Sequence, residues 1–240
     1  MNRLSLLIGA THGGLEMVSN DIAKMSSYLK SVTGGAWNDD EVMEIVDEPL
    51  VLIERILLTI KKNKPDFLLT YWSGHGGYSK RYEELLIEVT EKEAIRESNL
   101  LGLAQKQLLI FDTCNVILED AGLESFTESL KHRITASAID RVKARKYYEE
   151  LIAASGGIQI AYSCNISEYS TADDILGSIY TNAIIKQSKA WFSRQTSKGN
   201  VTIKEATRLA ENACARYSQH PKMTGPKIDQ RLYYPFAIKP

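Results

Sequence analysis

Cysteine is scarce in this chain, and neither sign of charge is in excess. The three cysteines, Cys114, Cys164 and Cys214, lie far apart in 240 residues. This spacing does not indicate a disulfide framework, and it leaves no Cys-x-x-Cys metal or redox motif. The four histidines form no pair with the spacing of zinc ligands, so we expect no metal site. A formal net charge of −1 argues against a general nucleic-acid-binding protein.

Long hydrophobic runs are missing as well. No apolar stretch approaches the roughly 18 residues that a transmembrane helix needs. The apolar run after Met1 ends at Gly9 and is too short for a signal peptide. We therefore expect a cytoplasmic protein that does not associate with a membrane. The length and the ordinary share of hydrophobic residues, 44%, suit one α/β domain or two small ones.

Continuous apolar runs in the sequence predict strands that are buried on both faces of a sheet. These runs are residues 4–8, 67–72, 107–111 and 158–162, with a final short strand at 233–238. Two further segments stay open at this point: residues 41–46 form a short strand or a loop, and residues 82–89 form a strand or a helix.

Segments with the apolar spacing of amphipathic helices alternate with these strands. The first helix begins at Asn20 or Asp21, because either residue is a suitable N-cap. Thr90 and Glu93 have the spacing of a capping box, which predicts a helix there. The expected helices are 20–29, 50–62, 90–104, 140–154, 177–191 and 204–217. This alternation indicates an α/β fold, in which helices cover both faces of a mostly parallel sheet.

Two of the expected strands end at reactive side chains. Residues 67–72 lead to His75, which has glycines on both sides, and residues 107–111 lead to Cys114. The carboxyl ends of parallel strands meet at one edge of a sheet, so these side chains can form a thiol nucleophile with a histidine base. Gly76 and the backbone N–H of Cys114 are candidate donors to the oxyanion. Taken singly, a strand-end Cys is typical of a buried core residue, and a Gly-His-Gly segment is typical of a turn.

The two segments also resemble motifs of a known family. Trp72-Ser73-Gly74-His75-Gly76 and Phe111-Asp112-Thr113-Cys114 resemble the two catalytic motifs of the caspase-like cysteine peptidases, most closely those of prokaryotic caspase homologues and metacaspases. The similarity continues in order along nearly the whole chain, at residues 6–9, 161–164, 177–181 and 219–223.

This resemblance implies a caspase-hemoglobinase fold, which is an α/β fold with a mostly parallel sheet flanked by helices on both faces. It also implies one peptidase domain over residues 1–240, with a part like the large subunit at about 1–130 and a part like the small subunit at about 140–240. The implied activity is that of a cysteine endopeptidase with a His75–Cys114 dyad, acting on protein or peptide substrates without a cofactor. Family members of this kind often act with a regulatory partner protein in prokaryotic stress or antiphage responses.

The chain departs from the family pattern at some positions. The family usually has a glycine soon after the nucleophile, whereas Asn115 follows Cys114 here. The segment between His75 and Cys114 contains no acidic cluster that matches a calcium site, so we do not expect calcium activation. The basic run from Lys131 to Lys146 is either a solvated helix face or the linker at which family members are often cut.

Specificity is expected to depend on acidic residues. Asp112 matches the acid two residues before the metacaspase nucleophile, and metacaspase-like enzymes cut after Arg or Lys. A carboxylate there would favour a cationic side chain through charge-assisted hydrogen bonds. Asp173 is the candidate for a second acid in this specificity pocket. The plainer interpretations are that Asp112 caps a loop and that Asp173 belongs to a solvated pair with Asp174.

Besides an active peptidase, the sequence leaves two interpretations open. The chain could be a catalytically silent scaffold or sensor with the same fold, or another cysteine hydrolase. His12 follows the first strand and is expected at the same edge of the sheet, where it either borders the site or packs a loop.

Overall fold

The protein is described by a computed structural model, which covers residues 1–117, 138–173, 176–225 and 232–240. Its centre is a six-stranded sheet with the strand order β12-β8-β7-β3-β1-β2. The strands are β1 (Arg3–Gly9), β2 (Val42–Val46), β3 (Phe67–Ser73), β7 (Lys106–Asp112), β8 (Ile158–Tyr162) and β12 (Lys222–Thr224). All neighbouring pairs are parallel except β8 and β12. The expected mostly parallel sheet is confirmed, and the four apolar runs are consecutive strands in it.

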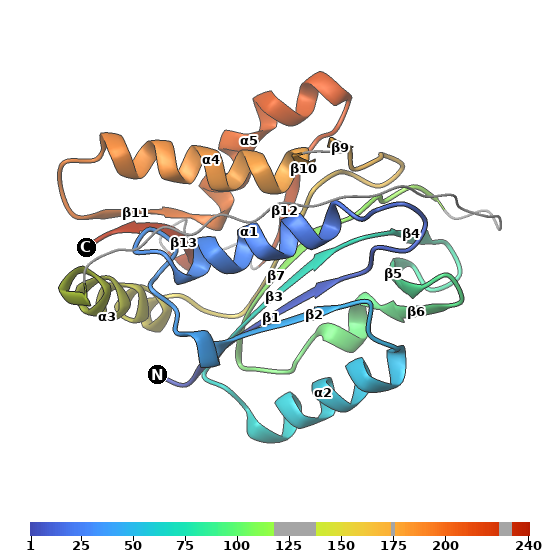
Figure 1. Cartoon of the computed structure of the whole chain (residues 1–240), viewed down its shortest axis with the longest axis horizontal. Coiled ribbons are helices and arrows are strands. Elements are labelled where there is room, and N and C mark those ends of the chain that lie inside the picture. Colours follow the sequence, from blue (N-terminus) through green and yellow to red (C-terminus); the bar gives the residue numbers. More distant parts are fainter. Residues whose placement is uncertain (118–137, 174–175, 226–231) are drawn as a thin grey trace.

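Helices cover both faces of this sheet (Figure 1). They are α1 (Val18–Lys30), α2 (Leu50–Asn63), α3 (Ala138–Ala154), α4 (Ile179–Arg194) and α5 (Ile203–Cys214). On α2, Ile53, Leu57 and Ile60 lie on one side of the helix and pack with Leu6 and Ile8 of β1. Successive strand residues point to opposite faces, so Leu7 packs instead with the core that α1, α3, α4 and α5 contribute to. Burial on both faces explains why every residue of β3 is buried.

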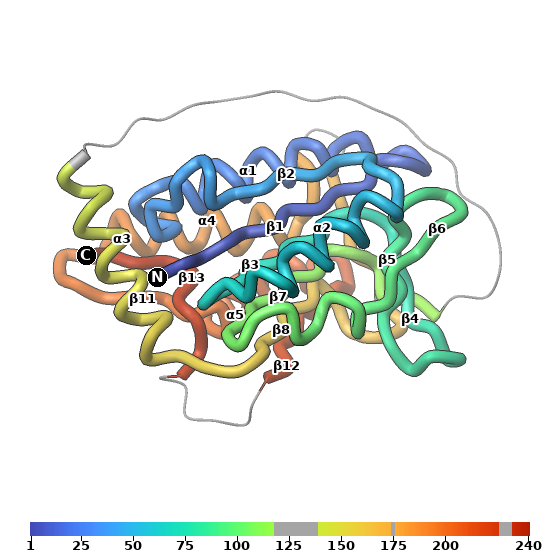
Figure 2. Tube along the Cα trace, turned by 90° about the horizontal axis from the view of Figure 1, so that it is seen from below, coloured from blue at the N-terminus to red at the C-terminus, as the bar shows by residue number. Residues whose placement is uncertain are grey.

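Three smaller sheets flank the main one. Strands β4 (Gly76–Ser79), β5 (Glu84–Thr90) and β6 (Glu93–Arg96) form an antiparallel sheet, β9 (Ala172–Asp173) pairs with β10 (Gly177–Ser178), and β11 (Gly199–Thr202) pairs with β13 (Pro235–Lys239). Short 3-10 helices are η1 (Asp39–Glu41), η2 (Glu97–Leu100) and η3 (Ala215–Tyr217). Figures 1 and 2 both place the β4–β6 sheet at one end of the molecule, and α3 with the two chain ends at the other.

The prediction of a helix at residues 90–104 is wrong. Residues 84–90 alternate between buried and partly buried positions, which is the pattern of a half-buried strand. The hydroxyl of Thr90 accepts hydrogen bonds from the backbone N–H groups of Lys92 and Glu93, at 3.3 Å and 3.1 Å. These bonds close a tight turn between β5 and β6. The capping-box pattern fits such a turn as well as a helix start, because a Ser or Thr side chain can bond to the backbone in both.

Two further expectations need a correction or lie outside the described residues. The first helix begins at Val18, with Met17 as its N-cap, so neither Asn20 nor Asp21 is the cap. Instead, the carboxylate of Asp21 accepts hydrogen bonds from the backbone N–H of Ser178 on a distant strand. The expected boundary between the two subunit-like parts, with Lys131 and Arg133, lies outside the described residues, as does Asp174.

Candidate active site

His75 and Cys114, the expected dyad residues, follow two neighbouring strands of the sheet. Strands β3 and β7 pair in register, with Ser73 opposite Asp112. His75 lies two residues after the end of β3, and Cys114 lies two residues after the end of β7. The backbone N–H of Gly74 donates to the carbonyl of Asp112 at 3.3 Å, which holds the two loops together. The structure thus brings both side chains to the carboxyl edge, where β1, β3, β7 and β8 end.

The glycines beside His75 allow close contact between these loops. Gly74 has a φ of +150°, a conformation that other residues rarely adopt. A Cβ on Gly76 would lie 2.7 Å from the hydroxyl of Thr113 and 2.7 Å from the carbonyl of Leu86. Gly76 therefore lets β4 approach the Cys114 loop. Its role as an oxyanion donor, together with the N–H of Cys114, stays a prediction.

His75 is held as a neutral imidazole. Burial lowers its pKa, and the charge of Glu88 and the backbone of Gly13 and His12 only partly oppose that effect. Its Nε2 atom is buried and has no hydrogen-bond partner among the described residues. A neutral ring can accept a proton, so His75 has the protonation state that a general base needs at neutral pH.

Cys114 is held as a thiol. Its side chain is half-buried, and its Sγ donates to the backbone carbonyl of Ser170 at 3.7 Å. Burial raises the pKa of the thiol, although the hydrogen bond with Ser170 opposes that effect. Cys114 and His75 are thus both uncharged in this unliganded structure. Activation of the nucleophile requires that the thiol proton pass to a base as substrate binds.

Asp112 is fully engaged in hydrogen bonds behind Cys114. It accepts from the hydroxyl of Ser170 at 2.9 Å, and from the backbone N–H and the hydroxyl of Thr181 at 3.2 Å and 2.5 Å. Burial raises the pKa of its carboxyl group despite these bonds. Asp112 therefore lies directly below the loop of Cys114, at the start of α4, where a cation could stabilise its charge.

Asp21 is a second buried acid that the sequence analysis did not select. It accepts from the backbone N–H of Ser178 at 3.0 Å and from the hydroxyl of Ser73 at 3.3 Å. Burial, and then the charge of Asp112, raise its pKa to about 7. A signal existed in the sequence, since Asp21 lies four residues before the buried Met25 and so faces the core.

Asp173 lies in a different environment. It is exposed on β9, and its carboxylate accepts from the backbone N–H of Leu176 at 2.8 Å. Burial lowers the pKa of the nearby Lys24, and the charges of Asp21 and Asp173 only partly oppose that effect. The described contacts favour Asp21 over Asp173 as the neighbour of Asp112, and a role of Asp173 in the specificity pocket stays a prediction.

A buried glutamine holds the segment that contacts both Cys114 and Asp112. The side-chain amide of Gln219 donates to the carbonyl of Ser163 at 2.8 Å and to the hydroxyl of Ser170 at 3.2 Å. Its carbonyl accepts from the N–H of Thr171 at 3.1 Å. Gln219 is fully buried, so these bonds fix residues 163–171 as one wall of the site.

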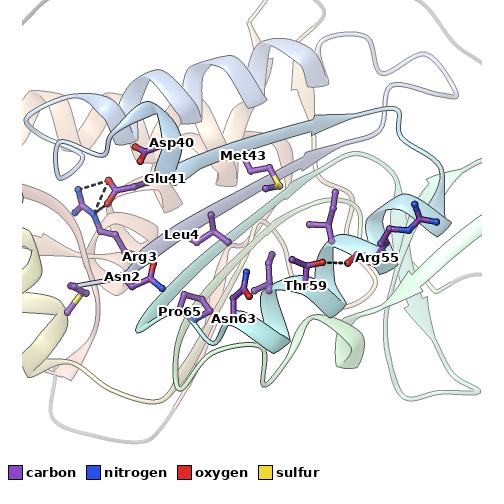
Figure 3. Close-up of a pocket in the computed structure, with 13 residues that line it drawn as sticks. Asn2, Arg3, Leu4, Asp40, Glu41, Met43, Arg55, Thr59, Asn63 and Pro65 are labelled. Atoms are coloured by element: carbon purple, nitrogen blue, oxygen red, sulfur yellow. Dashed lines mark hydrogen bonds and ion pairs between the residues drawn. The ribbon is translucent and has the colours of Figure 1, made fainter.

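Two hollows of the described part of the chain lie away from His75 and Cys114. One of about 500 Å³ lies between β1, β2 and α2, lined by Leu4, Glu41, Arg55 and Pro65 among others (Figure 3). It is near the amino edge, where the parallel strands begin, and thus at the other end of the sheet from His75. Among the described residues, no cluster of three His, Cys, Asp or Glu could hold a metal ion. No described helix is long and apolar enough to cross a membrane.

Comparison with known proteins agrees with this arrangement. The sequence model of the caspase-domain family matches residues 2–233 of the chain. The chain belongs to the caspase-domain family. This family consists of cysteine peptidases, and the resemblance noted in the sequence is confirmed. The crystal structure of caspase-1 from Spodoptera frugiperda aligns with a TM-score of 0.55, covering 99% of this chain and 85% of that one. At 13% identity this likeness shows the caspase fold alone. No curated protein matches the chain.

Proposed function

We propose that this caspase-domain protein is a cysteine endopeptidase in which Cys114 is the nucleophile and His75 the general base. The observation that carries the proposal is the placement of a neutral imidazole and a thiol at the ends of two strands that pair in register. His75 would take the thiol proton as the sulfur attacks the scissile carbonyl. It would then give that proton to the leaving amine. Water would hydrolyse the thioester, releasing the carboxylic acid and the free thiol.

The proposed specificity is cleavage after Arg or Lys. Asp112 and Asp21 are two buried carboxyl groups whose charges destabilise each other, and burial makes each charge more costly. A guanidinium or ammonium group beside them would relieve both effects. The raised pKa values of both acids support a specificity pocket that binds a cationic side chain of the substrate. An aspartate side chain in the substrate would face repulsion in the same place.

Other parts of the proposal rest on the family resemblance alone. These are a cytoplasmic location, a regulatory partner protein and a role in prokaryotic stress or antiphage defence. The alternatives of a catalytically silent scaffold and of another cysteine hydrolase are outcomes of the experiment below.

The test is covalent labelling with a peptidyl-arginine chloromethyl ketone, followed by mass spectrometry of the labelled peptide. We expect one adduct, on Cys114, in the wild type and none in Cys114→Ala. Cys164→Ala is the matched control, because Cys164 is a buried thiol that follows the neighbouring strand β8. Its Sγ donates to the carbonyl of Thr113, next to Cys114. It should still be labelled. A wild type that resists this reagent would indicate a silent scaffold, and labelling by an uncharged electrophile alone would indicate another hydrolase.

A further inference from the structure

Strand β2 forms one lateral edge of the main sheet, and β1 is its only neighbour among the described strands. An edge strand offers unpaired backbone N–H and C=O groups to a further strand, and proteins usually protect such an edge with lysine, proline or a β-bulge. Residues 42–46 contain neither lysine nor proline, and their register with β1 runs without a bulge. This edge is therefore suited to the addition of a strand.

Alternate residues of β2 point their backbone groups away from β1. The N–H of Asp47 donates to the carbonyl of Gly9 at 3.0 Å, and in a parallel ladder every second residue before it also bonds to β1. The N–H and C=O groups of Glu44 and Val46 then face outward. No backbone–backbone hydrogen bond of the described residues involves these groups. A strand that lies beside β2 can bond to them.

The two faces of β2 offer different side chains to such a strand. Met43 lies on the α2 face, is 39% exposed and borders the hollow of about 500 Å³ together with Leu4 and Ile56. Figure 3 shows Leu4 and Met43 on the sheet side of this hollow, opposite α2. Glu44 lies on the α1 face, where its carboxylate is 3.6 Å from Nζ of Lys30. An added strand thus meets a partly apolar hollow on one face and a carboxylate on the other.

Acidic residues surround this edge. Residues 38–48 contain no lysine or arginine but six acids, which are Asp39, Asp40, Glu41, Glu44, Asp47 and Glu48. Arg3 and Arg145 bind Glu41, and Lys30 binds Asp39 and Glu44, so these bases only partly balance the acids. Repulsion between like charges disfavours pairing of the β2 strands of two copies of the chain, whereas attraction favours a basic strand.

We propose that β2 binds a basic, extended segment of the protein substrate, which adds to the main sheet as a further strand. The backbone of the segment bonds to the outward groups of Glu44 and Val46. Its side chains alternate between the faces, with apolar ones toward the hollow beside Met43 and lysine or arginine toward Glu44. The identity of the bound chain as the substrate rests on the proposed function, whereas the strand addition does not.

The position of β2 relative to the proposed dyad indicates which part of the substrate reaches it. The strand order places Cys114 after β7 and His75 after β3, with β1 and β2 beyond His75. His75 protonates the leaving amine in the proposed mechanism, so the chain that follows the scissile bond leaves on the side of β1 and β2. Three strand spacings, about 14 Å, separate β7 from β2, and about four or five extended residues span that distance. The segment then enters beside Val46 and runs antiparallel to β2.

Binding of a model strand tests the inference without any cleavage. The probe is a fluorescein-labelled peptide of five Lys-Val repeats, and the protein is the full chain with Cys114→Ala. We expect saturable binding by fluorescence anisotropy, and a Kd that rises when the salt concentration increases from about 50 to about 300 mM. A peptide of five Glu-Val repeats should not bind, since the acids beside β2 repel it.

Substitutions at Glu44 separate charge from backbone pairing. In the same background, Glu44→Lys should raise the Kd by at least about tenfold. Glu44→Pro should raise it more than Glu44→Gln, because proline removes an outward N–H that no bond to β1 uses. Glu54→Lys is the matched control and should bind like the parent, since Glu54 is an exposed acid on α2 that does not border the hollow. Melting temperatures show whether each variant is folded; if Glu44→Pro is not, the two lysine variants still decide.

Cleavage by the wild type tests the identity of the bound chain. The substrate is an arginine peptide with a fluorescence donor and quencher that report only the bond after Arg. A version that continues into the Lys-Val repeats about five residues after that bond should have a KM at least about tenfold lower than the short version. Glu44→Lys should remove this gain and leave cleavage of the short peptide unchanged.

Equal binding by Glu44→Lys and Glu54→Lys, or binding of the Glu-Val peptide, would overturn strand addition at β2. Binding without the gain in KM would overturn the assignment of the substrate as the bound chain. If the wild type cleaved no peptide at all, the proposed function would fail, and the binding experiment alone would decide whether β2 takes up a basic strand.

Discussion

The two edges of the main sheet use charged and polar side chains in opposite ways. At the amino edge, Arg3 and Arg145 both bind Glu41, at 3.3 Å and 2.5 Å. Arg3 also stacks on Trp37, with its guanidinium carbon 4.5 Å from the ring. Burial opposes the charge of Glu41, but the hydrogen bonds from Arg145 and the charge of Arg3 lower its pKa to about 2. The charges there stabilise one another.

At the carboxyl edge, the same kinds of groups are left unfavourably placed. Burial raises the pKa values of Asp21 and Asp112 and lowers the pKa of His75. A cationic group of a substrate could stabilise the charges of the two acids, and a proton transferred to His75 would convert it to its charged form. The comparison teaches that paired charges support the fold at one edge, whereas groups with unfavourably shifted pKa values gather at the edge where we propose the active site, as is common in enzymes.

The largest expected effect is the loss of the dyad. Cys114→Ala or His75→Ala should lower kcat/KM on an arginine peptide by at least about a thousandfold, because members of a catalytic unit depend on each other. The melting temperature should change little, since both side chains are at the surface of the core. Cys164→Ala should keep its activity. If Cys164→Ala were inactive and Cys114→Ala active, the nucleophile would be assigned to the wrong strand.

A change at the amino edge should affect stability instead of activity. Glu41→Gln leaves the buried guanidinium of Arg3 without its carboxylate and should lower the free energy of unfolding by about 3 kcal/mol. The pKa of Glu41 is lowered from 4.5 to about 2 by folding. Its contribution should thus be present above pH 4.5 and disappear as the pH falls toward 2. Urea unfolding at several pH values measures this.

The control for that prediction is an exposed acid on α2. Glu54 is exposed, so Glu54→Gln should change the stability by less than about 0.5 kcal/mol. Loss of peptidase activity in folded Glu41→Gln would contradict the division between the two edges.

The acids of the carboxyl edge should show the reverse behaviour. Asp112→Asn and Asp21→Asn should lower kcat/KM on arginine peptides by about tenfold to a hundredfold, the cost of a lost charge-assisted hydrogen bond. Folding raises the pKa of Asp21 from 3.8 to about 7. The folded state then binds more protons in that range, and the wild type should lose stability as the pH rises through it.

Asp21→Asn removes this loss of stability. The variant should be more stable than the wild type by about 1 kcal/mol at pH 8, and the difference should shrink toward pH 4. Thermal unfolding at both pH values measures it. A variant that is less stable than the wild type at pH 8 would show that the charged carboxylate of Asp21 supports the fold.

The smallest expected effect is on the acid limb of the pH–rate profile. His75 must be neutral to accept the thiol proton, and burial lowers its pKa below the usual 6.5. Activity should therefore persist below pH 6.5 and fall only as the pH drops through the lowered pKa. An acid limb above pH 6.5 in kcat/KM would mean that His75 is not buried in this way in solution.

Most of the sheet could be predicted from the sequence, and so could the position of the two proposed dyad residues at its carboxyl edge, because these signals are local. Buried strands such as 67–72 are continuous apolar runs, and His75 and Cys114 stand directly after them. The strand at 84–90 and the turn at Thr90 cannot be predicted in the same way, since the same capping pattern is compatible with a helix or a turn. The sequence favours Asp21 as a cap because Asp is a common N-cap residue, whereas its actual partner, Ser178, is 157 residues away along the chain. Helical spacing relative to Met25 indicates that Asp21 faces the core, but it does not identify so distant a partner.

Hydrolysis of matched peptides that differ only in the residue before the scissile bond tests the account most directly. The wild type should cleave after Arg and Lys with kcat/KM at least about a hundredfold above that for Gln, and after Asp least of all. Cys114→Ala should cleave none of them. A preference for Asp or Gln would contradict the function assigned to Asp112 and Asp21, and cleavage by Cys114→Ala would contradict the proposed site itself.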